Sequence, residues 1–234
     1  MTLLERINAF KKRIDFFLIT LKRMSKQVSG RRFLFVGCGS GLEALCLKNE
    51  IPDSLVVGVD IDRSGFIKES KNMVNLIVCD GLSLPFRDEV FDFCYCYHVL
   101  EHVVSYQKCI EKMKMVLKGD GSLFLATPNR RRLLSRVSSV KDISLYKVIR
   151  ANLSQWLSRV RGNFLPGKRH CGFDEEELKR SLNGCFPTVI CLTTEYNVYI
   201  SKNSILEPFV KVCHAIGILR LFTVSHTFYC GKSL

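Results

Sequence analysis

The sequence predicts an α/β fold in which one central sheet is covered by helices on both faces. Seven short runs are rich in β-branched and aromatic residues, and helical patterns separate most of them. The runs are apolar almost throughout, as expected for strands that are buried on both faces. A chain of 234 residues suits one such domain with appendages.

The expected strands and helices begin after residue 31, and seven strands is the count expected for one domain of this class. The strand candidates are Phe33–Gly37, Leu55–Asp60, Leu76–Asp80, Phe91–Tyr97, Ser122–Thr127, Thr188–Glu195 and Thr223–Gly231. Helical periodicity fills 41–50, 63–71, 103–117, 174–183 and 205–219.

The first 30 residues carry a separate amphipathic pattern. Apolar residues recur at alternating steps of four and three, at Leu3, Ile7, Phe10, Ile14, Phe17, Leu21 and Met24. This spacing predicts a basic helix over residues 1–30 with one apolar stripe. The stripe suits packing on the body of the domain, or peripheral contact with a membrane surface or a partner.

The net charge of +13 is concentrated in two segments. Residues 1–32 carry +7 and residues 130–169 carry +10, whereas 33–129 sum to −4 and 170–234 to zero. The second basic segment interrupts the alternation of strands and helices, so we interpret about 130–169 as a helical cap inserted into a domain of residues 31–234. Both basic segments are expected to meet something anionic.

Composition disfavours several classes of protein. With 47% apolar and 24% charged residues, the chain is not disordered throughout. We find no apolar run near the roughly 20 residues of a membrane span and no signal-peptide pattern. The eleven cysteines form no C-x-x-C pair and lie mostly in apolar runs, which favours reduced, buried thiols. We therefore expect a cytoplasmic protein.

The sharpest motif is a glycine-rich turn between the first expected strand and the next helix. The apolar run Phe33–Val36 leads into Gly37–Gly41, which reads G-C-G-S-G. Glycine permits positive φ and close approach of a ligand, and the following helix offers unpaired N–H groups to an anionic group. The dinucleotide fingerprint would place its third glycine at position 42, where the chain has Leu42.

Carboxylates follow the second and third expected strands. Asp60 could accept hydrogen bonds from ribose hydroxyls, and Asp80 could accept one from an adenine amino group. Each acid also has a structural alternative, because Asp62 suits a helix cap and the pair Asp80-Gly81 suits a turn. A glycine loop and two acids at three successive strand ends together predict an adenosine site.

Taken together, these motifs resemble the class I S-adenosylmethionine-dependent methyltransferases, and among them the type 11 group that includes quinone-biosynthesis enzymes. The resemblance covers about 30–129 and 170–234, and it leaves out both basic segments. It implies a Rossmann-like sheet of seven strands, mostly parallel with an antiparallel last strand, and S-adenosylmethionine as cofactor. It rests on the glycine loop, Asp60, Asp80, Phe91-Asp92, Tyr97–Val103, Leu117–Asn129 and His170–Phe173.

The resemblance also implies which residues line the cofactor site. The glycine loop would lie along the methionine part of the cofactor. Asp60 would bind the ribose, and Asp80 would accept a hydrogen bond from the adenine amino group. Ile61 would flank the adenine, while Cys96 and Tyr97 would approach the methionine carboxyl end and the sulfonium. The full set is Gly37, Cys38, Gly39, Gly41, Asp60, Ile61, Asp80, Gly81, Leu82, Cys96 and Tyr97.

The segment after the fourth expected strand holds the candidate catalytic residues. An oxygen acceptor needs a base near neutral pH, and His102 or His98 could take its proton. In the ubiquinone O-methyltransferases that the chain resembles, a similar set is associated with a divalent ion. His98, Glu101 and His102 on one helical turn are therefore a candidate zinc or iron set. We expect no metal, with Glu101 and His102 lining the acceptor pocket instead.

The basic cap is compatible with several partners. Arg130–Arg132, Arg136 and Lys168–Arg169 could bind an anionic small molecule or lipid head group, methylated on oxygen, nitrogen or carbon. They could instead contact the phosphates of a structured RNA, with Trp156 as a stacking platform, or form only a solvated face. A non-catalytic interaction module is a further alternative. The sequence leaves the acceptor and the oligomeric state open.

Overall fold

A computed structural model describes most of the chain outside the expected cap. It covers residues 3–24, 26–130, 172–204 and 207–231, together with Leu153 and Leu157. The cap predicted over about 130–169 therefore lies outside the described residues, except for Arg130 and these two leucines. His170 and Trp156 lie outside them as well.

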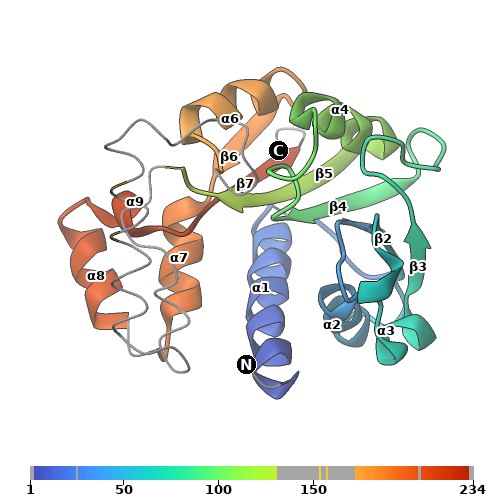
Figure 1. Cartoon of the computed structure of the whole chain (residues 1–234), viewed down its shortest axis with the longest axis horizontal. Helices are drawn as coiled ribbons and strands as arrows, with labels where there is room; N and C mark the ends of the chain where they lie inside the picture. The colour runs from blue at the N-terminus through green and yellow to red at the C-terminus, as the bar shows by residue number, and fades with distance from the viewer. Residues whose placement is uncertain are drawn as a thin grey trace.

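The described residues contain a central sheet of seven strands. These are β1 (Arg32–Val36), β2 (Leu55–Asp60), β3 (Asn75–Val78), β4 (Phe91–Tyr97), β5 (Leu117–Pro128), β6 (Thr188–Cys191) and β7 (Ser225–Gly231). Their order is β3-β2-β1-β4-β5-β7-β6 (Figure 1). Neighbours from β3 to β5 run parallel, whereas β7 runs antiparallel to both β5 and β6. The predicted class, a mostly parallel Rossmann-like sheet with an antiparallel last strand, is confirmed.

Helices cover both faces of this sheet (Figure 1). On one face lie α1 (Leu3–Arg23), α2 (Leu42–Glu50) and α7 (Thr193–Ser201), and on the other lie α4 (Tyr106–Val116) and α6 (Glu175–Asn183). Shorter elements are η1 (Arg63–Gly65), α3 (Lys68–Met73), α8 (Glu207–Ala215) and α9 (Leu219–Phe222). Each face has its own buried core, so the sheet is apolar on both sides as its sequence indicates.

Two predicted elements have different bounds near the carboxyl end of the chain. The strand expected over 188–195 ends at Cys191, because the chain turns into α7 and buries Tyr196 at 4% exposure. The helix expected over 205–219 is divided at Gly217, whose φ is +74°. The N–H groups of Gly217 and Ile218 bond back to the last turn of α8, which is the usual way a left-handed glycine ends a helix.

The amino-terminal helix α1 is packed into the core by its apolar stripe. Ile14, Phe17 and Leu21 are all 0% exposed. The ring of Phe17 lies 5.3 Å from that of Tyr95 and 5.2 Å from that of Phe124, centroid to centroid. Its stripe therefore covers the middle of the sheet. In the described part of the chain, neither α1 nor another helix is long and apolar enough to cross a membrane.

Phe17→Ala is expected to lower the free energy of unfolding by about 3–5 kcal/mol, because removing a buried ring leaves a cavity. Ile19→Ala is the matched control, since Ile19 lies on the same helix but is 48% exposed. We expect the control to cost less than about 1 kcal/mol. Urea denaturation followed by circular dichroism measures both values. Equal, small losses would show that α1 is not part of the cooperative fold.

Candidate active site

Two glycines of the loop after β1 are required by packing. Gly37 has a φ of +69°, and a Cβ at this position would lie 2.1 Å from Cγ2 of Val99, in the segment after β4. Gly41 has a φ of +78°, and a Cβ there would lie 2.8 Å from Cβ of Ser70 in α3. The loop is therefore held between β4 and α3 at contact distances that only glycine allows.

The middle glycine faces open space. Gly39 has a φ of +52°, and a Cβ at this position would meet no atom within 4 Å. Its N–H donates to Oδ2 of Asp60 at 2.7 Å, while Oδ1 of Asp60 accepts from the N–H of Asp62 at 3.0 Å. Asp60 thus fixes the loop, and each carboxylate oxygen keeps a lone pair for a further donor. The open space at Gly39 would allow a ligand to approach the backbone of the loop closely.

The second acid lies at the neighbouring strand end. The pairing of Asp60 with Val78 places the segment after β3 directly beside the end of β2. Asp80 is exposed, and its Oδ1 accepts from the N–H of Leu82 at 2.9 Å. Ile61 is 71% exposed between them, which is unusual for an isoleucine and suits an apolar ligand face. The structure therefore brings Gly39, Asp60, Ile61 and Asp80 to one edge of the sheet.

Two cysteines of the predicted cofactor set do not present their thiols to this edge. The Cys38 side chain packs toward β2, and burial raises the pKa of its thiol to about 12. Cys96 is 0% exposed among the apolar residues between the sheet and α4, and burial raises the pKa of its thiol well above the usual value. The expectation that Cys96 contacts the cofactor is not supported for its side chain, because β4 alternates and Cys96 points into the core.

The segment after β4 is a turn, and the helical turn expected at 98–102 is wrong. His98 has a φ of +57°, outside the helical region, and its N–H donates to the carbonyl of Ala126 in β5. The predicted start of the next helix at 103 moves to Tyr106, because Ser105 caps α4 there. The candidate histidines are thus fixed by the backbone of the sheet edge and not by a helix.

The turn places a carboxylate between the two imidazoles. Nδ1 of His98 and Nε2 of His102 each lie 3.9 Å from Oε1 of Glu101, whose side chain is 3% exposed. The His98 and His102 side chains are 34% and 44% exposed. Within the described ranges, no three His, Cys, Asp or Glu side chains are arranged to hold a metal ion, and this includes the candidate set. The arrangement suits a proton acceptor whose charged form a carboxylate stabilises.

His98 is also tied to the end of the sheet. Its Nε2 lies 2.7 Å from Oγ of Ser225, the first residue of β7. Its ring stacks on that of Tyr97 with centroids 4.4 Å apart. His98 therefore has a defined orientation, while the more exposed His102 is the more accessible of the two predicted bases.

Sequence reasoning missed a half-buried ion pair next to the glycine loop. Nη1 of Arg13 in α1 lies 3.0 Å from Oε1 of Glu43, in the first turn of α2. The hydroxyl of Tyr95 donates to the same oxygen at 3.3 Å. Burial raises the pKa of Glu43, and the Arg13 guanidinium opposes that rise. Burial lowers the pKa of Arg13, but Tyr97 and Glu43 more than compensate and keep it above its usual value.

The same arginine reaches the end of β4. Its Cζ lies 4.2 Å from the ring centroid of Tyr97, within the range of a cation–π contact. The Tyr97 hydroxyl lies 3.0 Å from that of Tyr196 in α7. No local pattern marks Arg13 or Tyr196, because their partners are far away in the sequence. The one sequence signal for this ion pair was Glu43, a charged residue close to the glycine loop.

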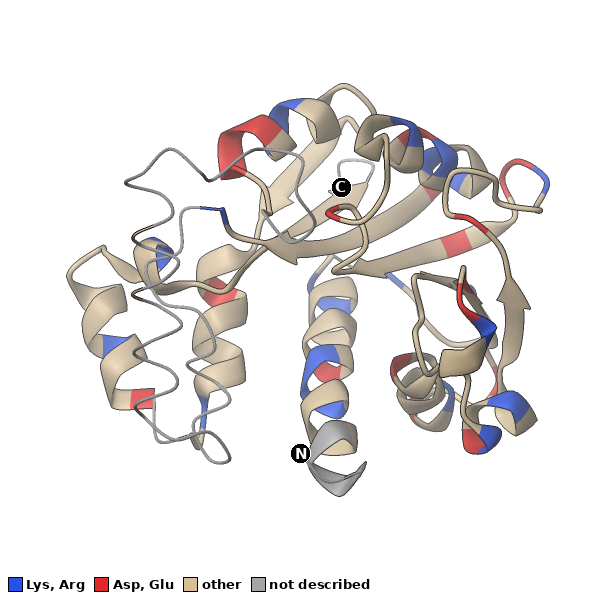
Figure 2. Ribbon diagram, viewed as in Figure 1, with Lys and Arg blue, Asp and Glu red and all other residues tan. Residues whose placement is uncertain are grey.

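Much of the basic charge of α1 is paired within the protein. Figure 2 shows Lys and Arg along most of this helix. Nζ of Lys11 lies 3.0 Å from Oε1 of Glu50 in α2, and Arg23 pairs with Glu195 in α7. These pairs reduce the charge that the helix offers to an anionic partner, so such a contact stays a prediction.

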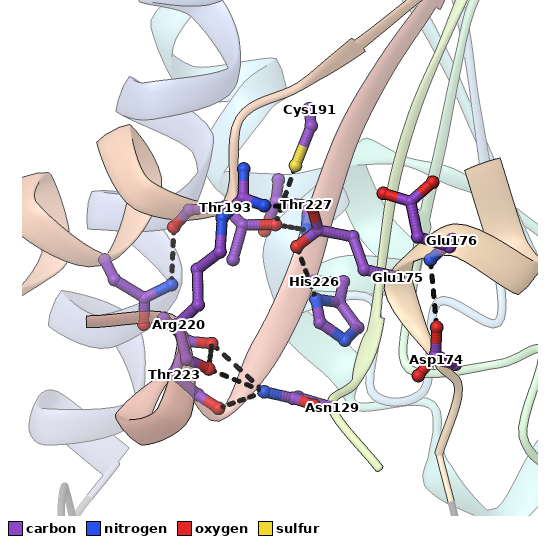
Figure 3. A network of polar contacts seen from close by, with 11 residues as sticks. Asn129, Asp174, Glu175, Glu176, Cys191, Thr193, Arg220, Thr223, His226 and Thr227 are labelled. Carbon is purple, nitrogen blue, oxygen red and sulfur yellow. Dashed lines mark hydrogen bonds and ion pairs between the residues drawn. The ribbon is translucent and has the colours of Figure 1, made fainter. Parts of the chain in front are cut away.

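A polar network closes the sheet edge beside β5 and β7 (Figure 3). The Asn129 side-chain amide donates to the carbonyls of Arg220 and Thr223 at 3.1 and 3.2 Å. Glu175 pairs with Arg220 at 3.0 Å and with Nδ1 of the buried His226 at 3.3 Å. The network joins the end of β5 to α6, α9 and β7, and so holds the strand that supports His98.

Known proteins that are similar to this chain include several methyltransferases. Residues 34–125 match the family described as methyltransferase domain. Ubiquinone biosynthesis O-methyltransferase of Coxiella burnetii is 32% identical over 121 residues, which are 48% of this chain and 50% of that protein. Demethylmenaquinone methyltransferase of Oceanobacillus iheyensis is 26% identical over 188 residues, which are 70% of this chain and 78% of that protein.

Solved structures show the same fold. The plantazolicin methyltransferase BpumL, in complex with a monoazolic desmethylPZN analog and SAH, superposes with a TM-score of 0.64 at 13% identity, over 97% of this chain and 86% of that one. The fold is that of the S-adenosylmethionine-dependent methyltransferases. More particularly, residues 34–125 match the methyltransferase-domain family, which confirms the resemblance seen in the sequence. The chain spans 50–65% of the length of the first curated relatives it matches.

Gly37→Ala and Gly39→Ala form a matched pair that tests the assignment of the glycines. Both place a side chain at positive φ, which costs about 1–2 kcal/mol. Only Gly37→Ala also meets Val99, so we expect it to lose about 3 kcal/mol of unfolding free energy in total. Thermal and urea denaturation measure the difference. Equal losses would mean that Val99 moves aside and that Gly37 is not needed for packing.

The network at α6 predicts a pH dependence of stability. The hydrogen bond from His226, followed by the charge of Arg220, outweighs burial and lowers the pKa of Glu175. A lowered pKa in the folded state stabilises the protein above the unfolded pKa of about 4.3 and is lost as the pH falls through the folded value. Glu175→Gln should therefore cost about 1 kcal/mol at pH 7 and little in acid.

The neighbouring Glu176→Gln is the control, because Glu176 is exposed. It should leave the stability unchanged at both pH values. Urea denaturation at pH 7 and at pH 3.5 gives the four comparisons. A loss for Glu175→Gln that is equal at both pH values would contradict the assignment, since it would not come from the carboxylate charge.

Proposed function

We propose that this chain is an S-adenosylmethionine-dependent methyltransferase. The observation that carries the proposal is the open backbone at Gly39, held by Asp60 and flanked by Asp80. A carboxylate beside a glycine cradle suits a ribose, and the second acid suits an adenine amino group. Similar solved structures include complexes with S-adenosyl-L-methionine and with SAH, and this supports the choice of cofactor.

The residues of the chain would have separable roles in the reaction. S-adenosylmethionine supplies a methyl group that its sulfonium has already activated. The protein then has to position the acceptor, exclude water and remove one proton. Asp60 and Asp80 bind the adenosine part through their remaining lone pairs. His102 or His98 takes the proton from the acceptor, and the nearby Glu101 stabilises the imidazolium that forms.

We propose a small or lipid-like acceptor that is methylated on oxygen. The name of one relative, ubiquinone biosynthesis O-methyltransferase, supports an oxygen acceptor, and the name of another, demethylmenaquinone methyltransferase, supports a quinone-like compound. The basic segments support an anionic group on the acceptor. Transfer of a labelled methyl group to hydroxylated aromatic compounds, with total RNA as the competing substrate, tests this choice. Label in RNA alone would replace the small acceptor by a nucleic acid.

Calorimetric titration with S-adenosylmethionine tests the cofactor site directly. We expect Asp80→Ala to weaken binding by about 10-fold to 100-fold, the usual loss for a hydrogen bond to a charged group. Asp80 is exposed and its side chain accepts one backbone hydrogen bond, from Leu82, so the loss should not come from unfolding. Asp88→Ala is the control at a second exposed acid and should bind like the wild type. Wild-type protein that binds no cofactor would leave only the interaction module.

A further inference from the structure

The Arg13 side chain extends from the amino-terminal helix α1 toward the candidate cofactor site. Arg13 leaves α1 on the face of the sheet that also carries α2 and α7, and its side chain is 27% exposed. It contacts Glu43, which lies two residues after the last glycine of the loop. Arg13 therefore joins α1 to α2, the helix that begins directly after the glycine loop.

Arg13 also contacts Tyr97, at the end of the strand that pairs with β1. Val36 pairs with Cys96 at the ends of β1 and β4, and Gly37 and Tyr97 are the next residues of the two segments. The guanidinium lies against the Tyr97 ring, with Cζ 4.2 Å from its centroid. Tyr97 has two further contacts. Its ring centroid lies 4.4 Å from that of His98, and its hydroxyl lies 3.0 Å from the Tyr196 hydroxyl.

Two physical points favour a role beyond stability for this arginine. Taking an ion pair out of water costs about as much as the pair returns, so the pair is a poor source of stability. The geometry is also specific to arginine, because a planar guanidinium can stack on a ring while its N–H groups bond a carboxylate. A lysine at position 13 could satisfy Glu43 but could not hold the ring in the same way.

We propose that Arg13 is a positioning residue of the active site, which orients Tyr97 beside the glycine loop and thereby links the docking of α1 to cofactor binding. The inference rests on the proposed function, since it concerns the same site. Tyr97 is then the residue that touches the methionine end of the cofactor, and Arg13 acts through it. Glu43 keeps the guanidinium in place from the side of α2.

The test compares the same substitution at two places on α1. Arg13→Lys keeps the charge opposite Glu43 but loses the planar stack on Tyr97. Arg23→Lys is the matched control, because Arg23 also pairs with an acid of a neighbouring helix but is 48% exposed and distant from the loop. Calorimetric titration with S-adenosylmethionine is run on both variants after circular dichroism shows that they are folded.

We expect Arg13→Lys to weaken cofactor binding about 10-fold and Arg23→Lys to stay within twofold of the wild type. Hydrogen exchange supplies a second readout on the wild-type protein, where the cofactor should slow amide exchange in α1 but not in α8. Equal binding by folded Arg13→Lys, or unchanged exchange in α1, overturns the inference while the proposed function stands. Failure of the wild type to bind the cofactor overturns both.

Discussion

The hydrogen bond from the Gly39 N–H to the Asp60 carboxylate is the interaction on which the candidate site depends. It joins the loop after β1 to the end of β2 and keeps the loop in a conformation with three residues at positive φ. Because Asp62 bonds the second carboxylate oxygen, the acid is oriented before a ligand arrives. A site that is already formed loses little freedom on binding, so more of the contact energy remains as affinity.

This loop is supported from both faces of the sheet. Val99 fills the space that a side chain at Gly37 would need, and it belongs to the turn that carries the two candidate bases. On the opposite face, Arg13 and Glu43 place a charged pair within an aromatic core. The glycine loop and the turn that carries the candidate bases therefore meet at one place, where β4 ends beside the glycine loop. A shift of that junction would move both together.

The fold, and the meeting of the glycine loop with two acids at one sheet edge, could be predicted because their signals are local. The glycine spacing at Gly37–Gly41 and the acids Asp60 and Asp80 each follow an apolar run, and parallel strands bring such ends to one edge. The turn at His98 could not be predicted, because its positive φ is set by a hydrogen bond to β5 and not by its neighbours. The burial of the Cys96 side chain was not predicted, although alternate residues of a strand face opposite sides of the sheet.

The sequence by itself determined the class of fold, the glycine loop and the identity of the two acids, since hydrophobic periodicity and strand-end residues act over a few positions. Only the tertiary structure decided which charged and aromatic side chains complete the site. Arg13 meets Glu43, and Tyr97 meets Tyr196, across separations of 30 and 99 residues. Such pairs form when helices from distant parts of the chain pack on one sheet face, and no short-range pattern encodes that packing.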